Sequence, residues 1–220
     1  MNAHIGFNPR AGKNSDALSD YVLTDLRSAS PKAIDNLIGT GNLVPGKNKD
    51  VAIGAAGLTV RNIDLVIREK DPTLSIQLSV ENKSIMAAHG KARKNRYGDL
   101  ISYCNHMHNH RRDCIAGATV VINTSEAYEN PDSFARGLLR PRVQMDRVVA
   151  GTIRIFESIP LRDSPDDPPE LPEALAVIML NYDGVNPATL IEGVPDILNP
   201  SHYDNFIKRL VAKYEDRFGA

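Results

Sequence analysis

Two short runs decide the fold of this chain: Asn62-Ile63-Asp64-Leu65-Val66-Ile67 and, after a polar gap, Ile76-Gln77-Leu78-Ser79-Val80-Glu81-Asn82-Lys83. Both runs alternate between apolar and polar residues, as β-strands with one buried face do. The alternation places Ile63, Leu65, Ile67, Ile76, Leu78 and Val80 on one face and Asp64, Glu81 and Lys83 on the other. The gap Glu69-Lys70-Asp71-Pro72-Thr73 carries turn residues, so the runs are predicted to form an antiparallel hairpin.

The predicted hairpin brings two acidic side chains together. A hairpin centred on the gap pairs Ile67 with Leu78, and the same register continued along both strands pairs Asp64 with Glu81. Directly opposed residues project from one face with Cβ atoms about 5 Å apart. Two carboxylates at that distance repel, so they need a cation between them or a shared proton. Lys83 lies on the same face, so the pattern indicates a divalent-metal site with a neighbouring ammonium, suited to phosphate chemistry.

The alternative interpretation of these residues is an ordinary solvated strand face. Lys83 would then be a simple salt-bridge partner, worth about 0–1 kcal/mol. A cross-strand Asp–Glu pair argues against this interpretation, because like charges directly opposite each other destabilise a sheet. We therefore interpret Asp64, Glu81 and Lys83 as a functional site.

The motif, Asp64 followed by Glu81-Asn82-Lys83, resembles that of the PD-(D/E)xK nuclease superfamily, and the chain resembles a type II restriction endonuclease. In that family the acidic residue starts one central strand and the (D/E)xK triplet ends the next. The resemblance covers a core of about residues 50–125, and it departs from the family pattern because Asn62-Ile63 replaces the Pro before Asp64. It implies a restriction-endonuclease-like α/β fold, a central mixed β-sheet flanked by helices, in a single domain over residues 1–220.

The resemblance implies a Mg²⁺-dependent, sequence-specific endonuclease that hydrolyses phosphodiester bonds of double-stranded DNA. Asp64 and Glu81 would bind Mg²⁺, which favours a few carboxylates, waters and phosphate oxygens, and the backbone carbonyl of Asn82 would add a third protein ligand. Lys83 would orient or deprotonate the attacking water, or contact the scissile phosphate, and these roles stay open. A homodimer on a palindromic site and a cognate DNA methyltransferase encoded nearby are also implied.

A basic segment follows the motif and contains no acidic residue between positions 89 and 98. Four cations at the start of a predicted helix oppose the helix macrodipole, which argues against a merely solvated helix start. We expect this segment to contact DNA phosphates. Its candidate DNA-binding residues are His89, Lys91, Arg93, Lys94 and Arg96.

The composition is that of an ordinary globular protein, with 220 residues, 42% hydrophobic and 24% charged, and a net charge of −1. No apolar run is long enough to span a membrane, and the N-terminus lacks the apolar core of a signal peptide. Two cysteines without a disulfide framework suit a reducing compartment. We therefore expect a cytoplasmic protein without a membrane partner.

The remaining periodicity predicts further elements along the chain. They are helices at 14–26, 31–38, 91–108 and 203–218, a helix within 125–150, strands at 118–122 and 176–180, a first strand or its approach at 51–60, a polar loop at 42–50 and an irregular loop at 159–172.

Two other patterns are weak. The segment from Gly6 to Asn14 approaches a phosphate-binding loop but has one intervening residue too many, so nucleotide hydrolysis is not expected. Cys104 and His108 lie one helical turn apart, as zinc ligands can, but the usual CxxC spacing is missing and a buried cysteine is the simpler interpretation. Candidates for an extra acidic metal ligand from the first predicted helix are Asp16, Asp20 and Asp25.

Two alternatives to a restriction enzyme stay open. The first is a DNA-repair or junction-resolving nuclease of the same fold, which would prefer branched or damaged DNA. The second is a non-catalytic DNA- or protein-binding module that keeps the fold. The complete set of Asp64, Glu81 and Lys83 argues against the second alternative, because a degenerate site usually loses one member.

Overall fold

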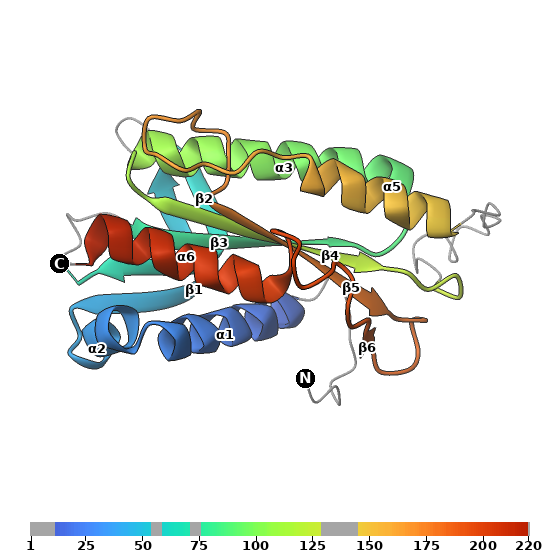
Figure 1. Ribbon diagram of the computed structural model, residues 1–220, viewed down its shortest axis with the longest axis horizontal. Helices are drawn as coiled ribbons and strands as arrows, with labels where there is room; N and C mark the ends of the chain where they lie inside the picture. Colours follow the sequence, from blue (N-terminus) through green and yellow to red (C-terminus); the bar gives the residue numbers. More distant parts are fainter. Residues whose placement is uncertain (1–11, 54–58, 71–75, 129–144, 220) are drawn as a thin grey trace.

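The computed structural model describes residues 12–53, 59–70, 76–128 and 145–219. Helices cover both faces of one sheet (Figure 1). The elements in chain order are α1 (Gly12–Ala29), a π-helical turn η1 (Pro31–Asp35), α2 (Asn36–Gly39), β1 (Leu43–Ile53), β2 (Thr59–Glu69), β3 (Ile76–Ile85), α3 (His89–His110), β4 (Ile115–Asn123), α5 (Met145–Glu157), β5 (Ala174–Asn181), β6 (Thr189–Leu190) and α6 (Tyr203–Phe218).

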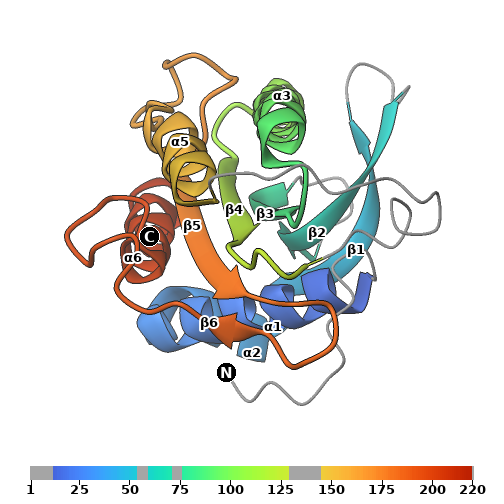
Figure 2. The same ribbon diagram turned by 90° about the vertical axis from the view of Figure 1, so that its right-hand side faces the viewer.

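The six strands lie in the order β1-β2-β3-β4-β5-β6. β1, β2 and β3 form an antiparallel meander, β4 and β5 continue parallel to β3, and β6 closes the edge in antiparallel orientation. Parallel neighbours need a crossover connection, and α3 lies between β3 and β4 in the chain. Figure 2 shows the curled sheet with α3 and α5 on one side and α1 and α2 on the other. The predicted mixed α/β architecture is therefore confirmed.

The register of the β2–β3 hairpin is as predicted. Ile67 pairs with Leu78 and Leu65 pairs with Val80, and the paired residues end there, one step before Asp64 and Glu81. The turn residues 71–75 lie outside the described part of the chain. β-Branched and aliphatic side chains dominate both strands, which suits a pleated and buried surface.

The predicted division of the hairpin into one apolar and one polar face is only partly right. Leu65 and Val80 pack, together with Ile67 and Leu78, in the apolar cluster that includes side chains of α1 and α6. Ile63 and Ile76 instead belong to the cluster that includes side chains of α3 and α5. A register irregularity between Ile67 and Arg68 lies opposite Ile76, and Ile63 lies beyond the last β2–β3 pair. Both faces of the hairpin are therefore covered, since helices pack on each.

Most other predicted elements are present, and one prediction is wrong. The polar loop expected at 42–50 is part of the edge strand β1. An edge strand tolerates Pro45, because only one side of the strand has a hydrogen-bonding neighbour. Segment 159–172 is irregular, as predicted, and the short strand β6 was not predicted. The helix expected within 125–150 corresponds in part to α5, and residues 129–144 lie outside the described ranges.

A buried ionic cluster joins the ends of several elements beside β5. The carboxylate of Glu173 has no exposed side-chain surface and accepts hydrogen bonds from His108 Nε2 at 2.9 Å, Arg162 at 3.0 Å and Arg217 at 2.8 Å. The backbone N–H of Ala116 donates to the same carboxylate at 2.8 Å. These partners come from α3, the irregular loop, α6 and β4, so one acidic group connects both layers of helices to the sheet.

Within the described residues, no helix has both the length and the apolar character required to cross a membrane.

Candidate functional site

β2 and β3 bring together the acidic residues and the lysine of the predicted motif. Asp64 lies on β2, and Glu81 and Lys83 lie on the second half of β3, the neighbouring interior strand. Glu81 is only 3% exposed, so it does not lie on a solvated strand face. The Lys83 ammonium donates a hydrogen bond to Glu81 Oε1. The side chains therefore form one small charged cluster, in which Glu81 is buried and Asp64 and Lys83 are partly exposed.

The surroundings of Glu81 shift the pKa of its carboxyl group. Its burial raises the pKa of the carboxyl group, the paired Lys83 lowers it, and the negative charge of Asp64 raises it again, so that the net shift is upward. Glu81 Oε2 is buried and has no hydrogen-bond partner among the described residues. Buried polar atoms are nearly always paired, so an unpartnered carboxylate oxygen marks a position where a cation or a donor can bind.

Asp64 is held by two hydrogen bonds from different elements. The hydroxyl group of Ser15 on α1 donates to Asp64 Oδ1 at 2.5 Å, and the backbone N–H of Asn82 donates to Asp64 Oδ2 at 2.7 Å. Each carboxylate oxygen can accept more than one hydrogen bond or ligand bond. These contacts orient the carboxylate and leave it able to bind a cation.

The middle residue of the triplet connects the site to its surroundings. The side-chain amide of Asn82 donates to Ser19 Oγ at 3.0 Å and to Ser15 Oγ at 3.2 Å, both on α1. Thr119 on β4 donates to Asn82 Oδ1 at 2.8 Å. The Asn82 side chain thus fixes α1 and β4 to the strand that carries Glu81. The role of its backbone carbonyl as a metal ligand stays a prediction.

Arg61 is a member of the site that sequence reasoning missed. Its guanidinium donates to Glu81 Oε1 at 3.3 Å and to the backbone carbonyl of Asp99 at 3.3 Å, and it lies 5.5 Å from the ring centroid of Tyr103. No local pattern reveals this contact, because it depends on how α3 packs over β2 and β3. The contact of Ser15 with Asp64 is hidden in the sequence for a similar reason, because it depends on how α1 packs against β2.

Two of those acidic residues of α1 have partners away from this site. Asp20 forms an ion pair with Lys47 at 2.6 Å, and Asp25 accepts a hydrogen bond from the hydroxyl group of Tyr203 at 2.8 Å. It is Ser15, one residue before Asp16, that reaches Asp64.

The N-terminal part of the phosphate-loop-like segment, residues 6–11, lies outside the described ranges.

The basic segment lies beside the charged cluster, but its members differ in their surroundings. Arg96 Nε donates to the carbonyl of Ser84 at 3.3 Å, directly after Lys83, and Arg96 also pairs with Asp99 at 2.6 Å. Lys91 and Lys94 are exposed near the start of α3. They are the cations of this segment best placed to meet a phosphate backbone.

Two of the predicted DNA-binding residues need correction or qualification. His89 is 5% exposed, and its Nε2 atom is 2.7 Å from the carbonyl oxygen of Asn123, so its surroundings are those of a buried structural residue and not of a DNA contact. Arg93 is partly buried against α5, where a Cβ atom at Gly151 would lie 2.9 Å from its guanidinium. The helix start buries these two side chains because α5 and β4 pack against it.

The Cys104–His108 pattern is not a zinc site. Both side chains are buried, and both ring nitrogens of His108 have oxygen partners, Pro169 O at 2.6 Å and Glu173 at 2.9 Å. In the described part of the chain, no three His, Cys, Asp or Glu side chains gather in a way that could hold a metal ion. The Asp64–Glu81 pair offers two carboxylates, which suits an ion that keeps several of its waters.

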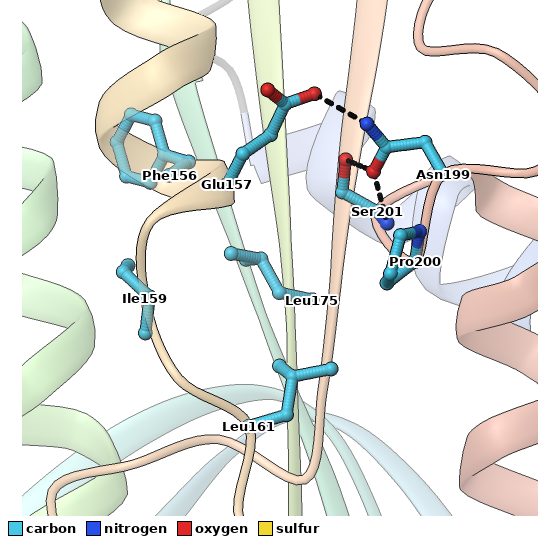
Figure 3. A pocket seen from close by; sticks show the side chains of 8 residues that line it. All are labelled: Phe156, Glu157, Ile159, Leu161, Leu175, Asn199, Pro200 and Ser201. Carbon is cyan, nitrogen blue, oxygen red and sulfur yellow. Dashed lines mark hydrogen bonds between the residues drawn. The ribbon is translucent and has the colours of Figure 1, made fainter.

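A small cavity of about 50 Å³ lies beside β5 and not at the charged cluster. Its lining is mostly apolar, with Phe156 and Leu175 prominent, and it includes a hydrogen bond of 2.8 Å between Asn199 and Glu157 (Figure 3). Ligand pockets usually measure about 300–1,000 Å³. This cavity is far too small for a nucleotide, so it is not a candidate substrate pocket.

Comparison with family models, with curated proteins and with solved structures found no match to this chain.

Proposed function

We propose that this protein is a Mg²⁺-dependent endonuclease of the PD-(D/E)xK type, with a restriction-endonuclease-like fold, that hydrolyses phosphodiester bonds in double-stranded DNA. The observation that carries the proposal is the buried, unpartnered Oε2 atom of Glu81 beside the charge of Asp64 and the ammonium of Lys83. Two carboxylates and a lysine on adjacent interior strands support the motif assignment, and the mixed sheet between helix layers supports the fold assignment.

The residues present fit a magnesium ion. Mg²⁺ binds through one or two carboxylates, several waters and phosphate oxygens, so it does not need a cage made only of protein side chains. Glu81 Oε2 and the carboxylate of Asp64 would hold it. When bound, Mg²⁺ would polarise the phosphate and lower the pKa of a coordinated water.

The chain's own side chains have distinct parts in this proposal. Ser15 and the N–H of Asn82 hold the Asp64 carboxylate in one orientation, so little rearrangement is needed on binding. Lys83 has three ammonium hydrogens, of which Glu81 engages one, and the others are available to a water or to a phosphate oxygen. Both roles of Lys83 place its ammonium beside the scissile phosphate.

The proposed partners are double-stranded DNA, a second copy of the chain and a DNA methyltransferase. Lys91 and Lys94 would contact the DNA backbone next to the cleavage site, because α3 begins close to Ser84. A symmetric homodimer would cut both strands of a palindromic site, since a twofold protein matches a twofold sequence. A DNA methyltransferase encoded nearby would protect the host sequence, as a functional and not a physical partner.

The proposal predicts cleavage that depends on Mg²⁺. Purified protein incubated with unmethylated phage DNA should give discrete fragments with Mg²⁺ and none with EDTA, because the carboxylate pair alone cannot stabilise the charge that develops on the phosphate. Gel electrophoresis and sequencing of the fragment ends give the recognition site. A continuous smear would favour a nonspecific or repair nuclease. DNA left intact in several buffers, on linear and branched substrates, would overturn the nuclease proposal.

Neutralising two exposed lysines should weaken DNA binding. The double variant Lys91→Gln/Lys94→Gln is expected to reduce the slope of log K against log salt by about 0.9 for each lost phosphate contact. Fluorescence anisotropy with a labelled duplex in the presence of Ca²⁺, at several salt concentrations, measures this slope. The matched control is Lys32→Gln/Lys208→Gln, which removes two exposed lysines from η1 and α6. Equal slopes for wild type and the first variant would remove the start of α3 from the interface.

A further inference from the structure

The charged cluster contains two acids and two bases. Asp64 and Glu81 contribute two negative charges, and Lys83 and Arg61 contribute two positive charges, both of them bound to Glu81 Oε1. A divalent cation that enters this site meets a net charge near zero and two cations beside one of its ligands. An anion must therefore accompany the metal ion, because charges in a partly buried site repel each other more strongly than charges in water.

Arg61 occupies this position although one of its hydrogen-bond donors has no partner. Its Nε atom is buried and has no hydrogen-bond partner among the described residues, and its side chain is 20% exposed. An unsatisfied buried donor destabilises the folded chain. Lys83 alone already neutralises Glu81, and the contacts of Arg61 with the Asp99 carbonyl and the Tyr103 ring hold a second cation beside the same carboxylate. Local conflicts of this kind mark positions that serve function.

We propose that Arg61 makes binding of the divalent cation depend on an anionic phosphodiester. In the free protein, the guanidinium and the ammonium of Lys83 balance the acidic pair and weaken the attraction for a metal ion. A phosphodiester restores the negative charge and offers the two cations a new partner, so the metal and the nucleic acid bind together. Arg61 is thus a positioning residue that acts through Glu81. This inference rests on the proposed function and assigns regulation to the same site.

A charge variant and a charge-preserving variant separate this role from a merely structural one. Arg61→Gln removes the positive charge, and Arg61→Met does so while keeping an unbranched apolar stem, in case the first variant fails to fold. Arg61→Lys keeps the charge. The matched control is Arg111→Gln, because the Arg111 side chain is equally exposed at 20% and pairs with Glu69 and Asp113 at the opposite end of β2. Thermal unfolding verifies that each variant is folded.

The measurement is binding of Mn²⁺ to each protein without DNA, followed by the electron paramagnetic resonance signal of the free ion. We expect Arg61→Gln to bind Mn²⁺ about tenfold more tightly than wild type. Arg61→Lys and Arg111→Gln should stay within about twofold of wild type, since the local charge is unchanged. Dimethyl phosphate, compared with sodium chloride at equal ionic strength, should tighten Mn²⁺ binding to wild type more than to Arg61→Gln.

The possible failures are distinguishable. If wild type cleaves DNA with Mg²⁺ but Arg61→Gln and Arg61→Met bind Mn²⁺ no more tightly than wild type, only the role of Arg61 is overturned. If no variant binds Mn²⁺ and wild type does not cleave DNA, the metal site itself is wrong. The double variant Arg61→Gln/Asp64→Asn should lose the tight Mn²⁺ binding, and its retention would place the ion outside the acidic pair and overturn the inference.

Discussion

Replacing Glu81 with Gln is expected to abolish Mg²⁺-dependent cleavage. Loss of an outer partner of a metal ligand alone lowers affinity or activity by about 10–100-fold, so loss of a ligand should exceed about 100-fold. Gln keeps the shape of the side chain but replaces the unpartnered Oε2 atom, the proposed ligand, with a neutral amide. Initial rates of cleavage measured on the same DNA for wild type and variant give the ratio.

The same substitution should leave the folded state as stable as wild type or more stable. Burial raises the pKa of Glu81 above its ordinary value of 4.5, so folding disfavours the ionised carboxylate relative to the unfolded chain. For a raised carboxyl pKa, the favourable contribution is present below the unfolded-state pKa and is lost as pH rises through the folded-state pKa. Ionisation of Glu81 therefore opposes folding, and a neutral Gln removes that penalty.

This pairing of lost activity with retained stability distinguishes a functional carboxylate from a structural one. Asp64→Asn and Lys83→Ala are expected to abolish cleavage as well, with their fold intact. Thermal unfolding at pH 7 and cleavage should be measured on the same purified samples. A Glu81→Gln protein that cuts DNA at close to the wild-type rate would remove Glu81 from the mechanism.

Replacing Glu173 with Gln is expected to cause a large loss of stability, in contrast to the replacement of Glu81. Arg162 and Arg217, whose side chains are 1% and 5% exposed, both pair with this carboxylate. Removing one partner of a buried ion pair destabilises a protein by about 3–5 kcal/mol, because the remaining charge stays buried without compensation. Two arginines lose their common partner here, so the value should lie at the upper end. Urea unfolding measures the free energy of unfolding for both proteins.

Glu173 should also influence how the stability of the protein falls at low pH. Burial raises the pKa of Glu173, but hydrogen bonds and charges from His108 and from its other partners outweigh it, so the pKa lies below the usual 4.5. For a lowered carboxyl pKa, the stabilising contribution is present above the unfolded-state pKa and is lost as pH falls through the folded-state pKa. Wild type should therefore lose stability on acidification below about pH 4.5, and Glu173→Gln should lose less over that range.

An exposed carboxylate with similar partners provides the control. Asp163 pairs with Arg209 at 2.7 Å and Lys213 at 3.2 Å, but its side chain is 71% exposed. Surface ion pairs contribute about 0–1 kcal/mol, so Asp163→Asn should change stability by no more than that. If Glu173→Gln is no less stable than Asp163→Asn, the buried cluster does not hold the helices to the sheet.

The hairpin and the acidic pair could be predicted because their determinants are local. Alternation of apolar residues and the turn residues around Pro72 specify the strands and their register, and Ile67 does pair with Leu78. The observed pairs end at Leu65 and Val80, one step before Asp64 and Glu81, and the effect of the Asp64 charge on the pKa of Glu81 shows that the two carboxylates are neighbours. Helix α6 was also predicted at its full length from its apolar stripe.

Predictions failed where long-range packing overrides the local pattern. The polar sequence around Pro45 is typical of a loop, but the open edge of β2 offers hydrogen bonds that turn it into strand β1. His89 lies in a basic segment and was expected to bind DNA, whereas it is buried at the start of α3 against the end of β4. Strand β1 forms because it pairs with β2, the next strand along the chain, and His89 is buried because β4 packs beside it, so neither outcome follows from the immediately adjacent residues.

The chain's local sequence thus places Asp64, Glu81 and Lys83 together, because a hairpin needs only its own strands and turn to set its register. The tertiary structure alone decides how that cluster is charged and held. Ser15 is distant in the chain from Asp64, and Arg61 reaches Glu81 beneath α3. Burial of Glu81 also requires a covering helix, and desolvation is a property of the whole packed protein and not of any one strand.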